Sequence, residues 1–284
     1  MQLAKQARIS VAVDHIDQVE AISRASAAAE AVVRLLIEVD IGMGRCGLSS
    51  SEAVLELARK LQGMRGVDFG GLQAYEGHFV NVVDREQRRI QSRAAMGLAV
   101  DTRQLIERSG IPVSCISGCS SATYDSTGIL DRVDEIQAGT YATMDRQYVR
   151  LTPEFEIALS ILVRVISRPS PGKAVLDVGV KGAGAEFGVL AIREYPDVVI
   201  PFFLAEEHVA VNQTPEWLIG QPLHLIPSHA CTTCNLYREI VAHEDGVVVD
   251  VWLIERTRAF AFVHAGWGGG AGAAWTGFSW GAGG

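Results

Sequence analysis

The chain has 284 residues, of which 48% are hydrophobic, and a formal net charge of −8. This length allows a sizeable core in one large domain or two smaller ones, and the negative charge argues against nucleic acid as the main partner. The first residues lack the apolar core of a signal peptide, and no apolar run reaches the roughly 18 residues that a membrane span needs. We therefore expect a cytoplasmic protein that does not bind membranes.

The first half of the chain alternates between strand and helix patterns. Apolar, β-branched runs predict strands at about 8–13, 32–39, 67–73, 112–116 and 134–137. Helical patterns fill three of the intervals, at about 16–30, 51–62 (with a serine as its cap) and 84–108. This alternation predicts a parallel sheet, and polar loops follow every strand after the first, as at the active-site end of a (β/α) barrel. A doubly wound sheet fits nearly as well, but its Gly-x-Gly-x-x-Gly fingerprint is absent.

The second half of the chain changes character after about residue 151. Short apolar runs predict strands at about 157–166, 174–178, 187–192, 198–204, 223–226 and 247–254, with a hairpin turn at 243–246. We therefore expect an α/β domain over residues 1–150 and a mostly antiparallel β domain over 151–258. The remaining residues, 259–284, are rich in Gly and Ala and are expected to be disordered.

A histidine and a cysteine, His229 and Cys231, lie two residues apart just after an apolar run. On a strand they would point to the same face and could reach one metal ion, and imidazole with thiolate favours zinc. The alternatives are a buried structural pair, or a redox pair of Cys231 with Cys234. An odd number of cysteines does not indicate a disulfide framework. The other three are most simply small buried residues: Cys46, Cys115 and Cys119.

Six short motifs occur in one order along the chain, up to about residue 258. They cover residues 39–47, 75–78, 117–123, 135–141, 206–208 and 227–235. In this order they resemble the D-serine dehydratase and D-threonine aldolase family, relatives of the alanine racemase fold. The resemblance implies a (β/α)8 TIM-type barrel that binds pyridoxal phosphate, followed by a β domain that carries metal ligands. Members are often homodimers, which we expect here too.

The resemblance implies a role for each matched site residue. Two loops would hold the cofactor phosphate, through Ser117, Gly118, Ser120, Gly139, Thr140 and Tyr141. Glycine lets backbone amides approach closely and hydroxyls add donors to a dianion, although without the resemblance an ordinary turn explains either loop. Arg45 would face the phenolic oxygen of the cofactor, and Tyr75 and His78 would line its pocket. Zn²⁺ would be bound by His229 and Cys231 near the substrate.

The reaction that the resemblance implies is a lyase reaction on a small D-3-hydroxy amino acid. Dehydration by β-elimination would yield a 2-oxo acid and ammonia, with the cofactor as electron sink and zinc as the Lewis acid on the hydroxyl. In this family His-x-Cys resembles the dehydratases, whereas aldolases tend to carry His-x-Asp, so Cys231 favours dehydration. A D-threonine-type aldolase is the alternative.

The lysine that forms the Schiff base with the cofactor has no counterpart here. In the family it lies on the first barrel strand, and none of the four lysines of this chain matches it: Lys5, Lys60, Lys173 and Lys181. We therefore expect a barrel that lacks its first strands at the N-terminus, and the catalytic residue stays unassigned. The chain would then be part of a lyase, or a non-catalytic homologue that acts in binding. Either way, we expect it alone to form no borohydride-reducible adduct with pyridoxal phosphate.

Overall fold

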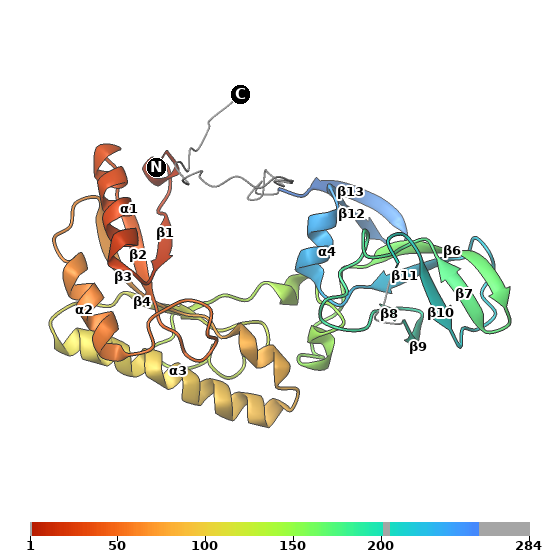
Figure 1. Cartoon of the computed structure of the whole chain (residues 1–284), viewed down its shortest axis with the longest axis horizontal. Coiled ribbons are helices and arrows are strands. Elements are labelled where there is room, and N and C mark those ends of the chain that lie inside the picture. The colour runs from red at the N-terminus through yellow and green to blue at the C-terminus, as the bar shows by residue number, and fades with distance from the viewer. Residues whose placement is uncertain (1, 201–204, 256–284) are drawn as a thin grey trace, which may run out of the picture. The chain divides into compact units, whose positions relative to one another are not determined.

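The computed structural model describes residues 2–200 and 205–255 of the chain. They fall into two compact units, residues 1–238 and residues 239–284. The first unit contains a parallel and an antiparallel sheet, and the second contains a hairpin (Figure 1). No helix within the described ranges is long and apolar enough to cross a membrane.

A parallel sheet of five strands forms the first half of the larger unit. Its strands lie side by side in chain order, β1 (Ser10–Val13), β2 (Val33–Glu38), β3 (Val67–Ala74), β4 (Cys115–Gly118) and β5 (Glu135–Ile136). All four pairings are parallel, as the alternation of patterns predicts. Helices α1 (Ile16–Ala28), α2 (Ser51–Leu61) and α3 (Arg85–Arg108) connect them, and four short 3-10 turns complete this half: Leu3–Lys5 (η1), Gly77–Asn81 (η2), Thr140–Ala142 (η3) and Tyr148–Arg150 (η4).

Each of the three α-helices of this half begins at a residue whose side chain accepts a hydrogen bond from the first turn. Ser50 caps α2 by accepting from the amide of Ala53, and Asp84 caps α3 by accepting from Gln87. His15 forms a capping box at α1. Because these side chains satisfy otherwise unpaired amides, the helix starts follow closely from the sequence.

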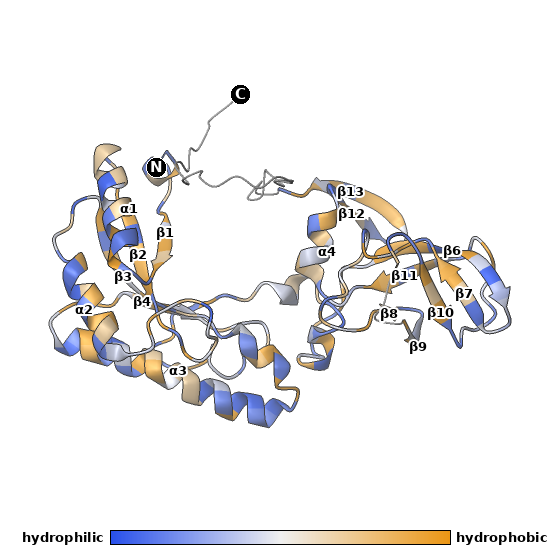
Figure 2. Cartoon of the chain, in the orientation of Figure 1, coloured by the Kyte–Doolittle hydropathy of each residue, from blue (hydrophilic) through white to orange (hydrophobic). Residues whose placement is uncertain are grey.

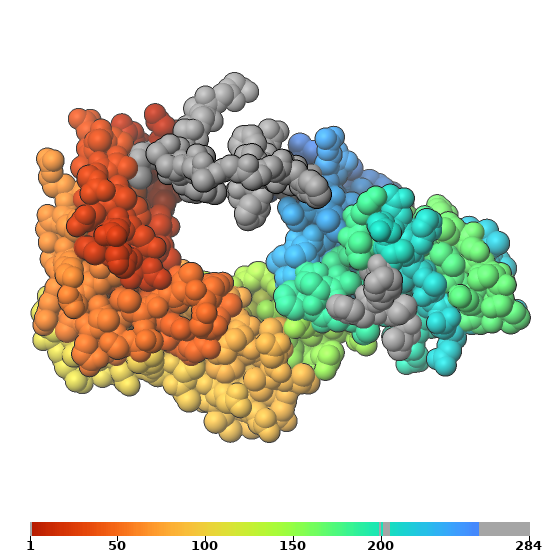
Figure 3. Space-filling model, viewed as in Figure 1, coloured from red at the N-terminus to blue at the C-terminus, as the bar shows by residue number. Residues whose placement is uncertain are grey.

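The core of this half lies between the helices and the sheet. Strand residues such as Leu35, Ile37, Leu72 and Ile116 are fully buried against apolar residues of the helices. Hydrophilic residues mark the outer side of α3 (Figure 2). In the space-filling view, α1, α2 and α3 make up much of the visible surface of this half, coloured red to yellow (Figure 3).

The fourth strand starts three residues later than the predicted range of 112–116. The carbonyl of Val113 accepts a hydrogen bond from the guanidinium of Arg103 at 3.1 Å, instead of joining the sheet. Pro112 has no amide hydrogen to donate. The strand therefore begins only at Cys115.

The second half of this unit is a six-stranded sheet in which every pairing is antiparallel. The strand order is β10-β7-β6-β11-β8-β9. The bounds are β6 (Ile161–Ser170), β7 (Lys173–Leu176), β8 (Ala191–Ile192), β9 (Tyr195–Val199), β10 (Val209–Asn212) and β11 (Pro222–Ile226). This confirms the predicted antiparallel sheet, although β10 was not predicted. Part of the predicted strand at 198–204 lies outside the described residues.

The second unit is a two-stranded hairpin of β12 (Glu239–Glu244) and β13 (Val247–Leu253). Asp245 and Gly246 form its turn with positive φ angles of 48° and 81°, as a tight hairpin requires. This confirms the predicted turn. Every residue of β13 is exposed, and the strand is largely hydrophobic (Figure 2). The predicted disordered segment 259–284 lies outside the described residues.

Candidate active site

Two predicted phosphate loops lie together after strands β4 and β5. We call residues 117–123 and 139–141 the cup loops. The amide of Tyr141 donates to the hydroxyl of Ser121 at 3.1 Å, which ties one loop to the other. The amide of Gln137 donates to the carbonyl of Gly118 at 2.7 Å. Because adjacent parallel strands end at the same edge of the sheet, loops twenty residues apart in sequence become neighbours.

The hydroxyls of the first cup loop have protein partners. Ser117 is buried and its hydroxyl accepts from the side-chain amide of Gln137 at 2.9 Å. Ser120 is also buried, and its hydroxyl lies 3.2 Å from that of Thr123. This loop is thus internally hydrogen-bonded.

The glycines of the cup loops differ in the space around them. A Cβ on Gly118 would come within 2.6 Å of the carbonyl oxygen of Ala74, so only glycine fits there. A Cβ on Gly139 would meet nothing within 4 Å. Gly139 precedes the short turn that contains Thr140 and Tyr141, and Tyr141 is half-exposed. The second cup loop therefore has free space around its glycine, Gly139, whereas the first cup loop has none around Gly118.

Arg45, Tyr75 and His78 come from the loops after β2 and β3. The guanidinium of Arg45 lies over the ring of Tyr75, 5.2 Å from its centroid, and 3.5 Å from a carboxylate oxygen of Glu38. Burial raises the pKa of Tyr75, which keeps its hydroxyl neutral. Burial lowers the pKa of His78, whose Nδ1 is buried with no hydrogen-bond partner in the described part of the chain. A cation and a neutral imidazole are thus available at this edge.

His229 and Cys231 are not on a strand, which corrects the prediction. Strand β11 ends at Ile226, and His229 is the N-cap of helix α4 (Ala230–Leu236), so Cys231 lies in its first turn. The carbonyl of His229 accepts from the backbone amide of Thr233 at 3.4 Å and from its hydroxyl at 2.8 Å. The two side chains still meet, through a hydrogen bond between imidazole and thiol.

A carboxylate that the sequence analysis missed holds the other side of the His229 ring. Asp145 is fully buried, and its Oδ2 lies 3.1 Å from His229 Nδ1 and accepts from the amide of Ala230 at 3.1 Å. Its Oδ1 accepts from the amide of Tyr148 at 2.9 Å. A carboxylate behind a histidine is the usual support of a metal ligand, since it fixes the ring orientation and tautomer.

The charges of this cluster are strongly coupled. The hydrogen bonds from Asp145 and then Cys231 raise the pKa of His229 to about 10, while His229 lowers the pKa of Cys231. The two side chains thus share a hydrogen bond, and a metal ion bound by both would displace its proton. No group of three or more His, Cys, Asp or Glu side chains within the described residues is arranged to hold a metal ion.

Electrostatic contacts connect these groups within the larger unit. Burial, followed by the nearby hydroxyl of Tyr75, raises the pKa of Tyr148 to about 12, and Asp145 and Cys231 contribute in the same direction. Thr140, in the second cup loop, hydrogen-bonds to the Tyr148 side chain. Residues from the loop after β3, from the segment after β5 and from α4 thus act on one another.

Neither the lysines nor the remaining cysteines extend this cluster. Lys60 pairs with Glu56 on α2, and Lys181 pairs with Glu207, both on the surface. All five cysteines are free. The prediction that three of them are buried is right for Cys115 and Cys119, and wrong for Cys46, which lies exposed in the loop after β2.

Glu76 is a second residue that the sequence analysis missed. It directly follows Tyr75, yet it is fully buried, and one carboxylate oxygen has no partner in the described part of the chain. The other oxygen accepts from the hydroxyl of Thr127, and Thr123 also hydrogen-bonds to the carboxyl group. Burial raises the pKa of Glu76 from 4.5 to about 7.

This raised pKa predicts a pH-dependent stability. Because folded Glu76 keeps its proton up to about pH 7, the folded state binds more protons than the unfolded state above pH 4.5, and stability falls as pH rises between these values. Glutamine cannot ionise. We therefore compare the free energy of unfolding of Glu76→Gln with that of wild type at about pH 5 and at about pH 8. The difference should shift in favour of the variant by about 2–3 kcal/mol between these pH values, at about 1.36 kcal/mol per pKa unit.

Urea unfolding at the two pH values measures this difference. The matched control is Glu56→Gln on the surface of α2, where Lys60 lowers the pKa instead of raising it. It should show no gain at the higher pH. Equal pH dependence of Glu76→Gln and wild type would show that Glu76 is ionised throughout this range.

Comparison with known proteins identifies the family. The alanine racemase N-terminal domain matches residues 1–147, and a putative serine dehydratase domain matches residues 158–243. D-threonine aldolase from Arthrobacter sp. is 37% identical over 262 residues, which cover 89% of this chain and 68% of that protein. The chain belongs to the D-serine dehydratase and D-threonine aldolase family. The members are pyridoxal phosphate-dependent lyases of fold type III, as the sequence motifs predict.

Two further family members agree with this assignment. D-threo-3-hydroxyaspartate dehydratase from Delftia sp. is 23% identical over 252 residues, covering 79% of this chain and 66% of that protein. The crystal structure of D-threonine aldolase from Filomicrobium marinum superposes with a TM-score of 0.85 at 29% identity, covering 89% of this chain and 70% of that one. This confirms the alanine racemase-like fold, with its barrel-like parallel sheet and antiparallel β domain. The chain spans about two thirds of the length of these curated relatives.

Proposed function

We propose that the protein carrying this chain is a pyridoxal phosphate- and zinc-dependent lyase that cleaves D-3-hydroxy amino acids. The observation that carries the proposal is His229, held between the buried carboxylate of Asp145 and the thiol of Cys231. A plain structural histidine needs no such pair of partners, whereas a metal ligand does. Family membership supplies the reaction class.

The residues around the cup loops fit the cofactor. A phosphate dianion needs converging donors and close backbone approach. The open position at Gly139 allows the close approach, and the hydroxyl of Thr140 beside it is one candidate donor. Bound there, the cofactor would supply an electron sink for the charge that develops at the substrate Cα. We assign its phosphate to the cup loops, its phenolic oxygen to Arg45, and the walls of its pocket to Tyr75 and His78.

The donor set of the metal cluster fits zinc. A nitrogen from His229 and a sulfur from Cys231 are ligands that zinc prefers over magnesium or calcium. Two protein ligands leave positions for water or for oxygens of the substrate. Asp145 would keep the ring oriented, and its proton on Nδ1, while the metal is bound.

Retro-aldol cleavage is the reaction that the similarity favours. The chain is 37% identical to a D-threonine aldolase and 23% identical to a D-threo-3-hydroxyaspartate dehydratase. Cleavage breaks the bond between Cα and Cβ, and the hydroxyl loses its proton to give glycine and an aldehyde. Dehydration is the second candidate, favoured by the cysteine at position 231, and it would give a 2-oxo acid and ammonia.

A product assay with D-threonine distinguishes these reactions. For the full-length protein that carries this chain, with pyridoxal phosphate and Zn²⁺, we expect equal amounts of glycine and acetaldehyde, no reaction with L-threonine, and loss of turnover on chelation or in His229→Ala. Release of 2-oxobutanoate and ammonia instead would establish the dehydratase. Failure to release either product pair from D-threonine or from 3-hydroxy-D-aspartate would reject the proposed function.

A further inference from the structure

Glu76 connects to the first cup loop through a chain of hydroxyl groups. Thr123 hydrogen-bonds to the Glu76 carboxyl group, and Thr123 Oγ1 in turn lies 3.2 Å from the hydroxyl of Ser120 and accepts from the Ser120 amide at 3.0 Å. The hydroxyl of Thr123, the last residue of the first cup loop, thus joins the buried carboxyl group to Ser120.

No cation compensates a charge on Glu76. It forms no ion pair within the described part of the chain, and the titratable groups in electrostatic contact with it are Tyr75 on the β3 side and Cys119 on the β4 side. Burial raises the pKa of Cys119 to about 11 and also raises that of Tyr75, so both are neutral near pH 7. The buried guanidinium of Arg88 donates to the Ala122 carbonyl of this loop at 2.9 Å, but it forms no ion pair with Glu76 within the described residues. An added anion near this loop would therefore repel an ionised Glu76.

The protonation state of Glu76 sets the direction of the hydroxyl chain. When Glu76 is ionised, Thr123 and Thr127 donate to it, and Thr123 must accept from Ser120, so the hydroxyls point inward. When it is protonated, Thr127 is free to donate to the carbonyl of Thr123, 3.3 Å away, and Thr123 is free to donate to Ser120. The Ser120 hydroxyl then accepts from Thr123, and its own hydrogen can be donated to a ligand oxygen.

We propose that Glu76 takes up a proton when the cofactor phosphate binds to the cup loops, so that the dianion and the proton bind together. The inference rests on the proposed function, since that function assigns the phosphate to these loops. Two effects act in the same direction: a neutral Glu76 removes like-charge repulsion from a buried dianion, and it frees loop hydroxyls as donors. The proton comes from solvent, and no covalent bond changes.

Isothermal titration calorimetry tests this proposal with pyridoxine 5′-phosphate, which carries the phosphate but no aldehyde and so needs no lysine. Titrations near pH 8 in two buffers of different ionisation enthalpy give the number of protons taken up. For wild type we expect close to one, and a dissociation constant that rises up to about tenfold per pH unit above the pKa of free Glu76. Unphosphorylated pyridoxine should lack this uptake.

The matched variant is Glu76→Gln, with Glu56→Gln as the surface control. Any protonation change of the ligand itself contributes equally to wild type and to both variants. Only Glu76→Gln should therefore lose the proton uptake and the pH dependence of binding, while Glu56→Gln keeps both. If Glu76→Gln misfolds by near-ultraviolet circular dichroism, Thr123→Val takes its place, because it keeps the carboxyl but breaks the hydroxyl link and should reduce the uptake.

The outcomes separate this inference from the proposed function. Binding of pyridoxine 5′-phosphate with the same proton count in wild type and Glu76→Gln would overturn the role of Glu76 and leave the cofactor site standing. The same proton count in wild type and Thr123→Val would overturn the hydroxyl link between Glu76 and the loop. A folded wild-type protein that binds the phosphate compound at no pH would overturn both.

Discussion

Replacing Asp145 by asparagine is expected to weaken zinc binding by about 10- to 100-fold. Asp145 accepts from Nδ1 of His229, which leaves the other ring nitrogen free of a proton when a metal binds. Asparagine can donate its amide hydrogen to Nδ1 instead, and the ring proton then moves to the nitrogen that the metal needs. The same carboxylate also caps the amides of Tyr148 and Ala230, so the ring would lose its fixed position too.

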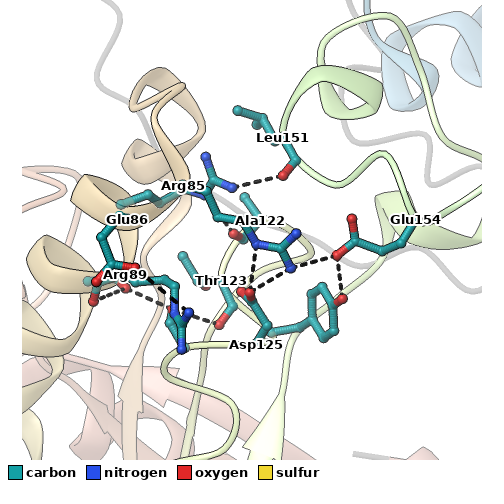
Figure 4. Close-up of polar contacts among 12 residues, drawn as sticks. Arg85, Glu86, Arg89, Ala122, Thr123, Asp125, Leu151 and Glu154 are labelled. Atoms are coloured by element: carbon teal, nitrogen blue, oxygen red, sulfur yellow. Dashed lines mark hydrogen bonds and ion pairs between the residues drawn. The ribbon is translucent and has the colours of Figure 1, made fainter.

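Metal titrations against a chromophoric chelator measure this loss. Cobalt as a substitute adds a second readout, because its thiolate charge-transfer band reports coordination by Cys231. Asp125→Asn is the control, since this carboxylate pairs with Arg85 and not with His229 (Figure 4). Zinc affinity of Asp145→Asn within about twofold of wild type would contradict the supporting role that we assign to Asp145, given the loss expected for such partners.

Replacing Arg88 by methionine is expected to destabilise the larger unit by about 4 kcal/mol or more. The Arg88 side chain is 1% exposed and donates to four backbone carbonyls, those of Val82, Val83, Ala122 and Leu151. Methionine fills similar volume but leaves these buried acceptors without donors. Because the four carbonyls belong to the loop after β3, to the first cup loop and to the segment after β5, the loss should also loosen the cofactor site.

The matched control is Arg85→Met, one turn earlier on α3. Arg85 pairs with Asp125 and Glu154 at 2.7 and 2.8 Å, yet its side chain is 48% exposed (Figure 4). Surface ion pairs contribute about 1 kcal/mol or less, so this variant should unfold close to wild type in urea. Equal destabilisation of the two variants would show that the buried hydrogen bonds of Arg88 contribute no more than a surface ion pair.

The order of the elements in the first half follows from local patterns. Helix starts at Ser50 and Asp84 depend on a side chain that satisfies amides within its own turn, so sequence alone locates them. The start of β4 depends on Arg103, ten residues away, which takes the carbonyl of Val113 out of the sheet. The conformation at His229 was predicted wrongly because an apolar run before it suggested a continuing strand, whereas helix α4 begins directly after this residue.

The sequence by itself determined the family, the parallel and antiparallel halves, and the chemical groups at the cup loops and at His229 and Cys231, since these depend on residue type and short spacing. Only the tertiary structure decided which carboxyl groups act on them. Asp145 lies 84 residues from His229, and Glu76 is buried by residues about fifty positions later in the chain. Burial and hydrogen bonding across such separations arise from packing, and they alone suggest the roles that we propose for Asp145 as the support of a metal ligand and for Glu76 as a proton-binding group.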